Sequence, residues 1–332
     1  MKLVSFVAGS AADALAEIQR RLGPDAVVVS VRPVSFWNIS RLWKKNCKIE
    51  VTAGVPDKTS APKPDTISPP GQIPESAGGF ASGESRWRSV IWLEAMGLLP
   101  IHAERLQMHL RAVHGEMPPE PLEEEWQVVS RALSHFWLKP PPIDGGAEPR
   151  PHVFIGPPGS GKTTALCKWL TLASLLEERA ARVWRLDGAT ANMAEFLALH
   201  CEMLGVPLER FWSNPETAGE LWFVDLPGVD IADAPALDAL RRQIAGLPSP
   251  RVHLVLNAAY EMPALLAQWR AFEPCGPEDL IFTHLDEETR RVKLWNFVFG
   301  TNCSLRFLGA GQKIPGEFRN ASPEILLPAK TP

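Results

Sequence analysis

Cysteine and tyrosine are scarce in this sequence of 332 residues, which holds five cysteines and a single tyrosine. No two cysteines form a C-x-x-C pair, which argues against a disulfide framework and against a cysteine-based zinc site. The eight histidines also lack the spacing typical of metal ligands. A reducing compartment suits such a chain, so we predict a cytoplasmic protein.

The sequence also lacks long apolar runs and an excess of positive charge. No run reaches the roughly 18 apolar residues that a membrane-spanning helix needs, and Asp13 and Glu17 come too early for a signal peptide. The net charge is −4, from 34 Lys and Arg against 38 Asp and Glu. This balance argues against a protein that coats nucleic acid over its whole surface, and no nucleic-acid partner is expected.

The first 55 residues predict a small β-α-β-β domain. Residues 2–8 alternate in apolar character, as a half-buried strand does, and residues 11–22 place apolar side chains at helical spacing. Residues 26–31 and 47–53 are apolar and rich in β-branched side chains, which favours two further strands.

Proline is plentiful, with 32 residues, and its clusters mark boundaries. Residues 56–84 combine proline with Ser, Thr and Gly, and they offer too little apolar surface to offset the entropy lost on ordering. We predict a flexible linker there. Residues 85–139 predict a helical N domain with three helices, at Arg86–Leu98, His102–His114 and Pro121–Leu138.

Residues 150–328 predict an α/β domain. Short apolar strands alternate with helical stretches, and this alternation is typical of a mostly parallel sheet with helices on both faces. The expected strands are His152–Ile155, Arg182–Leu186, Leu221–Val224, Val252–Leu256, Leu280–Phe282 and Leu305–Leu308. Ligands of such sheets bind at the carboxyl ends of the strands.

A phosphate-binding loop follows the first of these strands. Residues 156–164 match the pattern G-x-x-x-x-G-K-[ST], and a predicted helix at 163–176 follows. Such a loop turns its backbone N–H groups inward, and the helix N-terminus adds partial positive charge, so that together they hold a β-phosphate. The alternative is a glycine-rich turn that matches by chance. The candidate phosphate ligands are Gly156, Gly159, Ser160, Gly161, Lys162, Thr163 and Thr164.

Asp225 is the candidate partner of a magnesium ion. It ends the apolar strand that begins at Leu221, and in P-loop sites Mg²⁺ is held by the loop hydroxyl, here Thr163, and by an acid at a neighbouring strand end. Lys162 would bridge the β- and γ-phosphates. The alternative for Asp225 is a turn-forming residue before Pro227-Gly228.

Several segments resemble the GTPase domain of the signal-recognition-particle class. Leu166–Lys168 resembles its L-A-K motif, Thr283–Glu287 its guanine motif T-K-L-D-E, and Gly309–Pro315 its closing loop. Residues 13–30 and 50–53 are similar to the first domain of FlhF, the flagellar branch of that class. The order of parts also matches, and the resemblance covers nearly the whole chain except the linker.

The resemblance implies that Thr283, Asp286, Gly311 and Gln312 bind guanine and that Asp187 positions the attacking water. The chemistry of Asp286 agrees, because a carboxylate accepts from the N1–H and the 2-amino group of guanine, whereas adenine would leave it unpaired. The alternative is that Asp286 is a surface acid.

The sequence departs from the class at three charged positions. Thr190 and Val229 replace two arginines near the phosphates, and His284 replaces the lysine of the guanine motif. An arginine that stabilises the charge of phosphoryl transfer raises the rate by factors of thousands. We therefore predict a GTP-binding protein with Mg²⁺ whose hydrolysis is weak or depends on a partner.

The resemblance implies a homodimer on GTP binding, a MinD-like ATPase as regulator, flagellar basal-body components as partners, and a place on the inner face of the membrane. Basic and aromatic residues between Arg32 and Lys48 fit an anionic lipid surface or an acidic partner, and equally a solvated hairpin. Two other functions remain open: a non-hydrolysing nucleotide-binding scaffold and an ATP-dependent P-loop enzyme.

Overall fold

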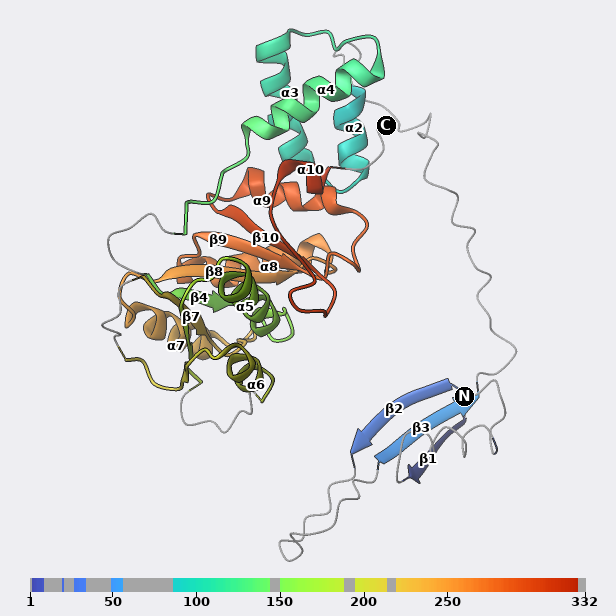
Figure 1. Cartoon of the computed structure of the whole chain (residues 1–332). Helices are drawn as coiled ribbons and strands as arrows, with labels where there is room; N and C mark the ends of the chain where they lie inside the picture. Colours follow the sequence, from blue (N-terminus) through green and yellow to red (C-terminus); the bar gives the residue numbers. More distant parts are fainter. Residues whose placement is uncertain are drawn as a thin grey trace, which may run out of the picture. The chain divides into compact units, whose positions relative to one another are not determined.

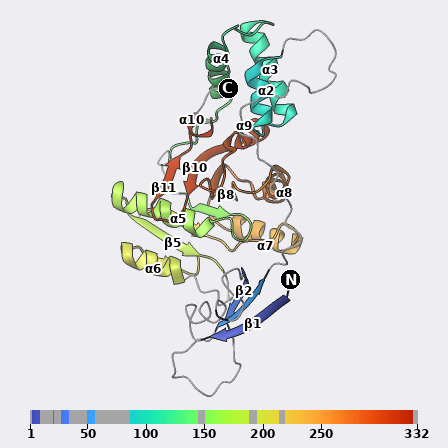
Figure 2. The same cartoon turned by 90° about the vertical axis from the view of Figure 1, so that its right-hand side faces the viewer.

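The computed structural model describes residues 2–8, 20, 27–33, 49–55, 86–143, 150–187, 195–213 and 219–327. Figures 1 and 2 show the chain in two views. Backbone contacts divide it into two units, Met1–Phe80 and Ala81–Pro332. Each unit is described by itself.

The first unit contains a three-stranded antiparallel sheet. β3 (Ile49–Val55) lies between β1 (Lys2–Ala8) and β2 (Val27–Pro33) and pairs with both. All three strands were predicted, two of them one or two residues too early. The predicted helix at 11–22 and the predicted linker at 56–84 lie outside the described residues, apart from Arg20.

The second unit begins with the three predicted helices: α2 (Arg88–Ala95), α3 (Pro100–His114) and α4 (Leu122–His135). A proline starts α3, and three glutamates in the first turn of α4 complement the helix dipole. Apolar side chains at helical spacing, such as Leu106, Leu110 and Val129, are fully buried between the helices.

An eight-stranded sheet forms the rest of this unit. Its order is β11-β10-β9-β8-β4-β7-β5-β6, and every neighbouring pair is parallel except β10 and β11. The strands are β4 (His152–Ile155), β5 (Ala181–Arg185), β6 (Leu208–Glu209), β7 (Leu221–Asp225), β8 (Arg251–Asn257), β9 (Asp279–Thr283), β10 (Ser304–Ala310) and β11 (Glu317–Asn320). This is an α/β P-loop fold, and the predicted fold class is confirmed.

Helices cover both faces of the sheet. Along β4 the side chains alternate: Val153 and Ile155 belong to one apolar cluster, and Phe154 belongs to the other. The first cluster lies under α7 (Ala234–Ala245), α8 (Met262–Phe272) and α9 (Trp295–Gly300), and the second under α5 (Lys162–Thr171) and α6 (Glu195–Leu204). The short helix α10 (Pro323–Leu326) follows β11.

Two strands and one helix end differ from the sequence-based expectation. β6 has only two residues, and β11 buries only Phe318, so neither carries the continuous apolar run that predicts a buried strand. The helix predicted over 163–176 is α-helical to Thr171 and continues as one π-helical turn, Leu172–Leu176. In the part of the chain that the structure describes, no helix has both the length and the apolarity to cross a bilayer.

The helices α2–α4 are attached to the sheet domain through α9 (Figure 1). Asn296 accepts a hydrogen bond from the backbone N–H of Leu99 at 2.8 Å and donates to the carbonyl of Gly97 at 2.8 Å. The ring of His102 stacks on Phe299 with 5.7 Å between centroids. These contacts fix the start of α3 against α9.

Candidate nucleotide-binding site

The glycine-rich loop lies between β4 and α5, where the order of the strands reverses. β4 pairs with β7 on one side and with β8 on the other, so the loop opens at the switch point of the sheet. In open parallel sheets this is where ligands bind, because the connections diverge there and leave a crevice.

Backbone geometry in the loop demands glycine at two positions. Gly156 has φ +145°, and a Cβ there would lie 2.4 Å from the carbonyl oxygen of Val255. Gly161 has φ +84° and is the N-cap of α5. Because Gly161 has no side chain to cap the helix, the first N–H groups of α5 are available to an anion.

Lys162 is a buried cation at the start of α5. Its side chain reaches back over the loop, and Nζ donates to the carbonyl of Pro157 at 2.9 Å. Burial lowers the pKa of Lys162 to about 8, against the opposing effect of Asp225. Gly228 packs so closely that a Cβ there would lie 2.9 Å from Nζ. A phosphate would supply the negative charge that this ammonium lacks.

Thr163 and Asp225 meet as the sequence predicts for a magnesium site. Thr163 Oγ1 donates to Asp225 Oδ2 at 2.9 Å, and Asp225 is 1% exposed. Its other oxygen, Oδ1, is buried and has no hydrogen-bond partner among the described residues. Hydroxyl and carboxylate oxygens are the ligands that Mg²⁺ prefers, so these residues fit the ion.

Two arginines that the sequence reasoning missed contact Asp225 and Asp187. Arg185 Nη1 donates to Asp225 Oδ2 at 2.7 Å, and its Nε donates to Asp187 Oδ2 at 3.0 Å. Arg210 Nη2 donates to Asp187 Oδ1 at 2.7 Å. Burial acts to raise the pKa of Asp187, but the hydrogen bonds from Arg210 and Arg185 outweigh it and lower the pKa. Both oxygens of Asp187 therefore accept from arginine.

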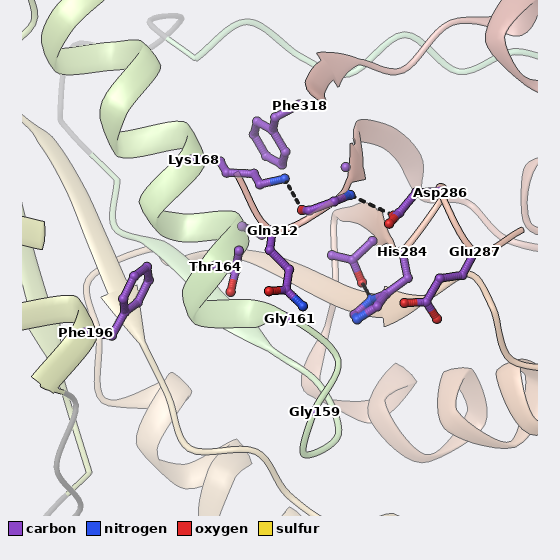
Figure 3. A pocket seen from close by; sticks show the side chains of 14 residues that line it. Gly159, Gly161, Thr164, Lys168, Phe196, His284, Asp286, Glu287, Gln312 and Phe318 are labelled. Atoms are coloured by element: carbon purple, nitrogen blue, oxygen red, sulfur yellow. Dashed lines mark hydrogen bonds between the residues drawn. The ribbon is translucent and has the colours of Figure 1, made fainter. Parts of the chain in front are cut away.

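A cavity of ≈ 510 Å³ opens beside the loop (Figure 3). It gathers seven residues predicted to bind nucleotide, from three segments far apart in the sequence. These are Gly159, Gly161, Thr164, Thr283, Asp286, Gly311 and Gln312. The predicted residues Gly156, Ser160, Lys162 and Thr163, with Asp187 and Asp225, do not line this cavity and belong to the phosphate side described above.

Hydrogen bonds join the two sides into one site. Thr283 Oγ1 donates to the carbonyl of Ser160 at 2.7 Å, which ties the predicted guanine motif to the phosphate loop. Asp286 Oδ1 accepts from the backbone N–H of Gly311 at 2.7 Å, and this bond lowers the pKa of Asp286. Lys168 Nζ donates to the carbonyl of Gly311 at 2.7 Å from the opposite side (Figure 3).

Seven further residues line the cavity that were not predicted as ligands: Ala165, Lys168, Phe196, His284, Glu287, Gly309 and Phe318. Lys168 was noted only as part of the L-A-K resemblance. His284 stands at φ +56°, with Nδ1 2.8 Å from Thr283 Oγ1. Phe196 projects from α6, which lies across the cavity from Asp286 in Figure 3.

Comparison with known proteins confirms the resemblance seen in the motifs. No protein-family model matches the chain. The chain is 24% identical over 361 aligned positions to the flagellar biosynthesis protein FlhF of Bacillus subtilis, covering 97% of this chain and 98% of that protein. It is 28% identical to the signal recognition particle 54 kDa protein of Staphylothermus marinus over 61% of this chain and 50% of that one.

The fold is also that of a solved relative. The crystal structure of FlhF complexed with GTP/Mg²⁺ superposes with a TM-score of 0.59 at 22% identity and covers 73% of this chain and 96% of that one. The chain is thus a divergent relative of the FlhF proteins and shares the α/β fold of the signal-recognition-particle class.

Proposed function

We propose that this divergent relative of the FlhF proteins binds GTP with Mg²⁺ and acts in the assembly or placement of the bacterial flagellum. The observation that carries the proposal is the continuity of the site. One hydrogen bond, from Thr283 to the carbonyl of Ser160, joins a phosphate loop with a buried lysine to a cavity that ends at a carboxylate. A purine nucleoside triphosphate needs the same two neighbouring environments: a positively charged loop for its phosphates and a cavity with a polar group for its base.

Each part of the site has a distinct task in this proposal. The loop N–H groups and Lys162 hold the phosphates, and Asp286 accepts from the N1–H and the 2-amino group of guanine. Thr163 and Asp225 would hold Mg²⁺, which neutralises charge on the β- and γ-phosphate oxygens when it is bound. Gly311 and Gln312 would close over the base.

Hydrolysis is proposed to be slow without a partner. Val229 stands where the class carries an arginine, and it is largely buried. The second replaced arginine, at Thr190, lies outside the described residues. Asp187, the candidate that positions water, accepts hydrogen bonds from Arg185 and Arg210. These hydrogen bonds lower the pKa of Asp187, which makes the carboxylate a weaker base toward an attacking water.

The wider biology is proposed from the relatives. We propose a cytoplasmic protein that forms a homodimer with GTP, responds to a MinD-like ATPase, and meets basal-body components at the inner membrane face. A small N-terminal domain (1–55), a linker (56–84), a helical N domain (85–139) and a G domain (150–328) would divide these tasks. The basic segment proposed to meet lipid, from Arg32 to Lys48, lies outside the described residues except for the end of β2.

Single-turnover mixing tests binding and hydrolysis together. A trace of radiolabelled GTP is mixed with an excess of the purified full-length chain and Mg²⁺. We expect nearly all nucleotide to be retained with the protein, while conversion to GDP proceeds at least about a thousandfold more slowly than in an arginine-assisted site. Rapid conversion to GDP by the chain alone would refute the proposal of weak hydrolysis, and failure to retain GTP would refute the proposed binding.

A further inference from the structure

Arg185 occupies an unusual place beside the phosphate loop. It is the last residue of β5 and stands directly opposite Asp225, the last residue of β7, in the register of the parallel pair. Its side chain is 13% exposed, and the two carboxylates that it contacts are 1% exposed. A guanidinium stays charged at any physiological pH, so this is a permanent cation at the sheet edge.

The role of Arg185 follows from the charged groups around it. Asp225 Oδ2 accepts from both Thr163 Oγ1 and Arg185 Nη1. The Thr163 hydroxyl and the Asp225 carboxylate are the oxygen ligands expected to hold a divalent cation, so the guanidinium lies on a metal ligand. Lys162 supplies a second positive charge that acts on Asp225. Without Arg185, the buried carboxylate of Asp225 would face incoming phosphates with only Lys162 to offset it.

We propose that Arg185 competes with the divalent cation for Asp225 and keeps the phosphate site partly neutralised when that cation is absent. The inference rests on the proposed binding of GTP. It assigns to a strand residue some of the positive charge that this chain lacks at Thr190 and Val229, where its relatives carry arginine.

The consequence is a weak coupling between nucleotide and metal. A monovalent guanidinium on Asp225 makes the carboxylate a poorer metal ligand, and it also lowers the repulsion that metal-free phosphates meet there. Coupling is reciprocal, so the factor by which Mg²⁺ strengthens nucleotide binding equals the factor by which nucleotide strengthens Mg²⁺ binding. Both factors should grow when the guanidinium is removed.

The test is the ratio of nucleotide dissociation constants measured in EDTA and in Mg²⁺. A fluorescent, non-hydrolysable GTP analogue is titrated with the full-length chain, with Arg185→Gln and with Arg185→Lys. Arg182→Gln is the matched control, since Arg182 lies on the same strand and pairs with Glu209 and Glu220 away from the loop. Thermal melts without nucleotide report whether each variant is folded.

We expect the ratio to rise about tenfold in Arg185→Gln, mostly through weaker binding in EDTA, and to change less than about threefold in Arg185→Lys and Arg182→Gln. A Gln variant with the wild-type ratio overturns the inference. If Arg185→Gln does not fold, Arg185→Lys is the deciding variant. A large rise of its ratio of dissociation constants, although the positive charge is retained, would contradict the inference as well. Absence of binding by the wild-type chain under both conditions refutes the proposed function instead.

Discussion

Replacing Lys162 by alanine should weaken GTP binding by roughly 100-fold or more. Lys162 is 7% exposed and its Nζ donates to the carbonyl of Pro157, so the ammonium is positioned above the loop by the protein itself. Removing it takes away a buried positive charge that would face the phosphates, and only Asp225 acts against its burial in the structure. The measurement is an equilibrium titration of GTP with Mg²⁺ by calorimetry.

An exposed lysine provides the control for this change. Lys139 follows α4 outside the candidate site, and Lys139→Ala should bind GTP as the unmodified chain does. Lys162→Ala should remain folded, because deleting a buried cation removes a desolvation cost along with one hydrogen bond. Equal affinity of Lys162→Ala and the unmodified chain would show that the loop does not hold the phosphates.

Asp279→Ala should lower the free energy of unfolding by about 3–5 kcal/mol. Asp279 is fully buried at the start of β9, and its carboxylate accepts from Arg251 Nε at 2.9 Å and from Arg306 Nε at 2.8 Å. The hydroxyl of Ser304 also donates to it. Truncation leaves two guanidinium groups, each 4% exposed, without their shared counter-charge.

This cluster also anchors the segment that leads from the helices into the sheet. Arg306 Nη2 donates to the carbonyl of Pro141 at 2.7 Å, and Arg251 Nη1 donates to that of Pro142 at 3.2 Å. The acid that orients both arginines therefore supports the connection between α4 and β4, far from the phosphate loop. Loss of Asp279 should loosen that connection as well as the sheet.

Urea unfolding followed by tryptophan fluorescence measures the effect, since Trp169 is buried against His253, whose Nδ1 lies 3.3 Å from Asp279 Oδ2. Asp238→Ala is the control, because Asp238 pairs with Arg241 at the surface and should cost less than about 0.5 kcal/mol. An Asp279→Ala chain as stable as Asp238→Ala would contradict this account of the cluster.

The free energy of unfolding should also decrease as the pH falls below about 6.5. Burial lowers the pKa of His152 and of His253 in the folded chain, so the unfolded chain takes up protons first and protonation favours unfolding.

The fold could be predicted from the sequence because its central strands are buried on both faces. Leu280–Phe282 is a continuous apolar run, and Val252–Leu256 is one apart from His253, so both can be recognised as buried strands from the sequence alone. β6 and β11 were missed for the opposite reason. Both are short, β6 is only half-buried and β11 is mostly exposed, and only their pairing with β5 and β10 makes them strands.

The phosphate-binding part of the site could be predicted because local backbone geometry determines which residues it needs. A glycine such as Gly156 is needed where the backbone itself leaves no room for a Cβ, and that need appears in the sequence as a motif. Arg185 and Arg210 carry no motif. Their roles depend on the pairing of β5 with β7 and on a turn after β6, which are long-range contacts.

The residues predicted to bind the base could be identified only from the resemblance to the family. Asp286 stands among other acids, and nothing local separates it from Glu287. The structure distinguishes Asp286 by its hydrogen bond from Gly311, a residue 25 positions away. Lys168 was overlooked as a ligand because its contacts with the carbonyls of Ala310 and Gly311 arise from packing of α5 against the closing loop.

The most direct measurement is displacement of a fluorescent guanine nucleotide by unlabelled GTP and by ATP, with Mg²⁺ present. If Asp286 reads guanine beside the phosphate loop, GTP should displace the probe at roughly 100-fold lower concentration than ATP, because adenine leaves the carboxylate unpaired. Asp286→Ala should remove most of that preference while keeping the phosphate contacts. Displacement by ATP and GTP at equal concentrations, or no binding of the probe, would contradict the assignment of this cavity to GTP.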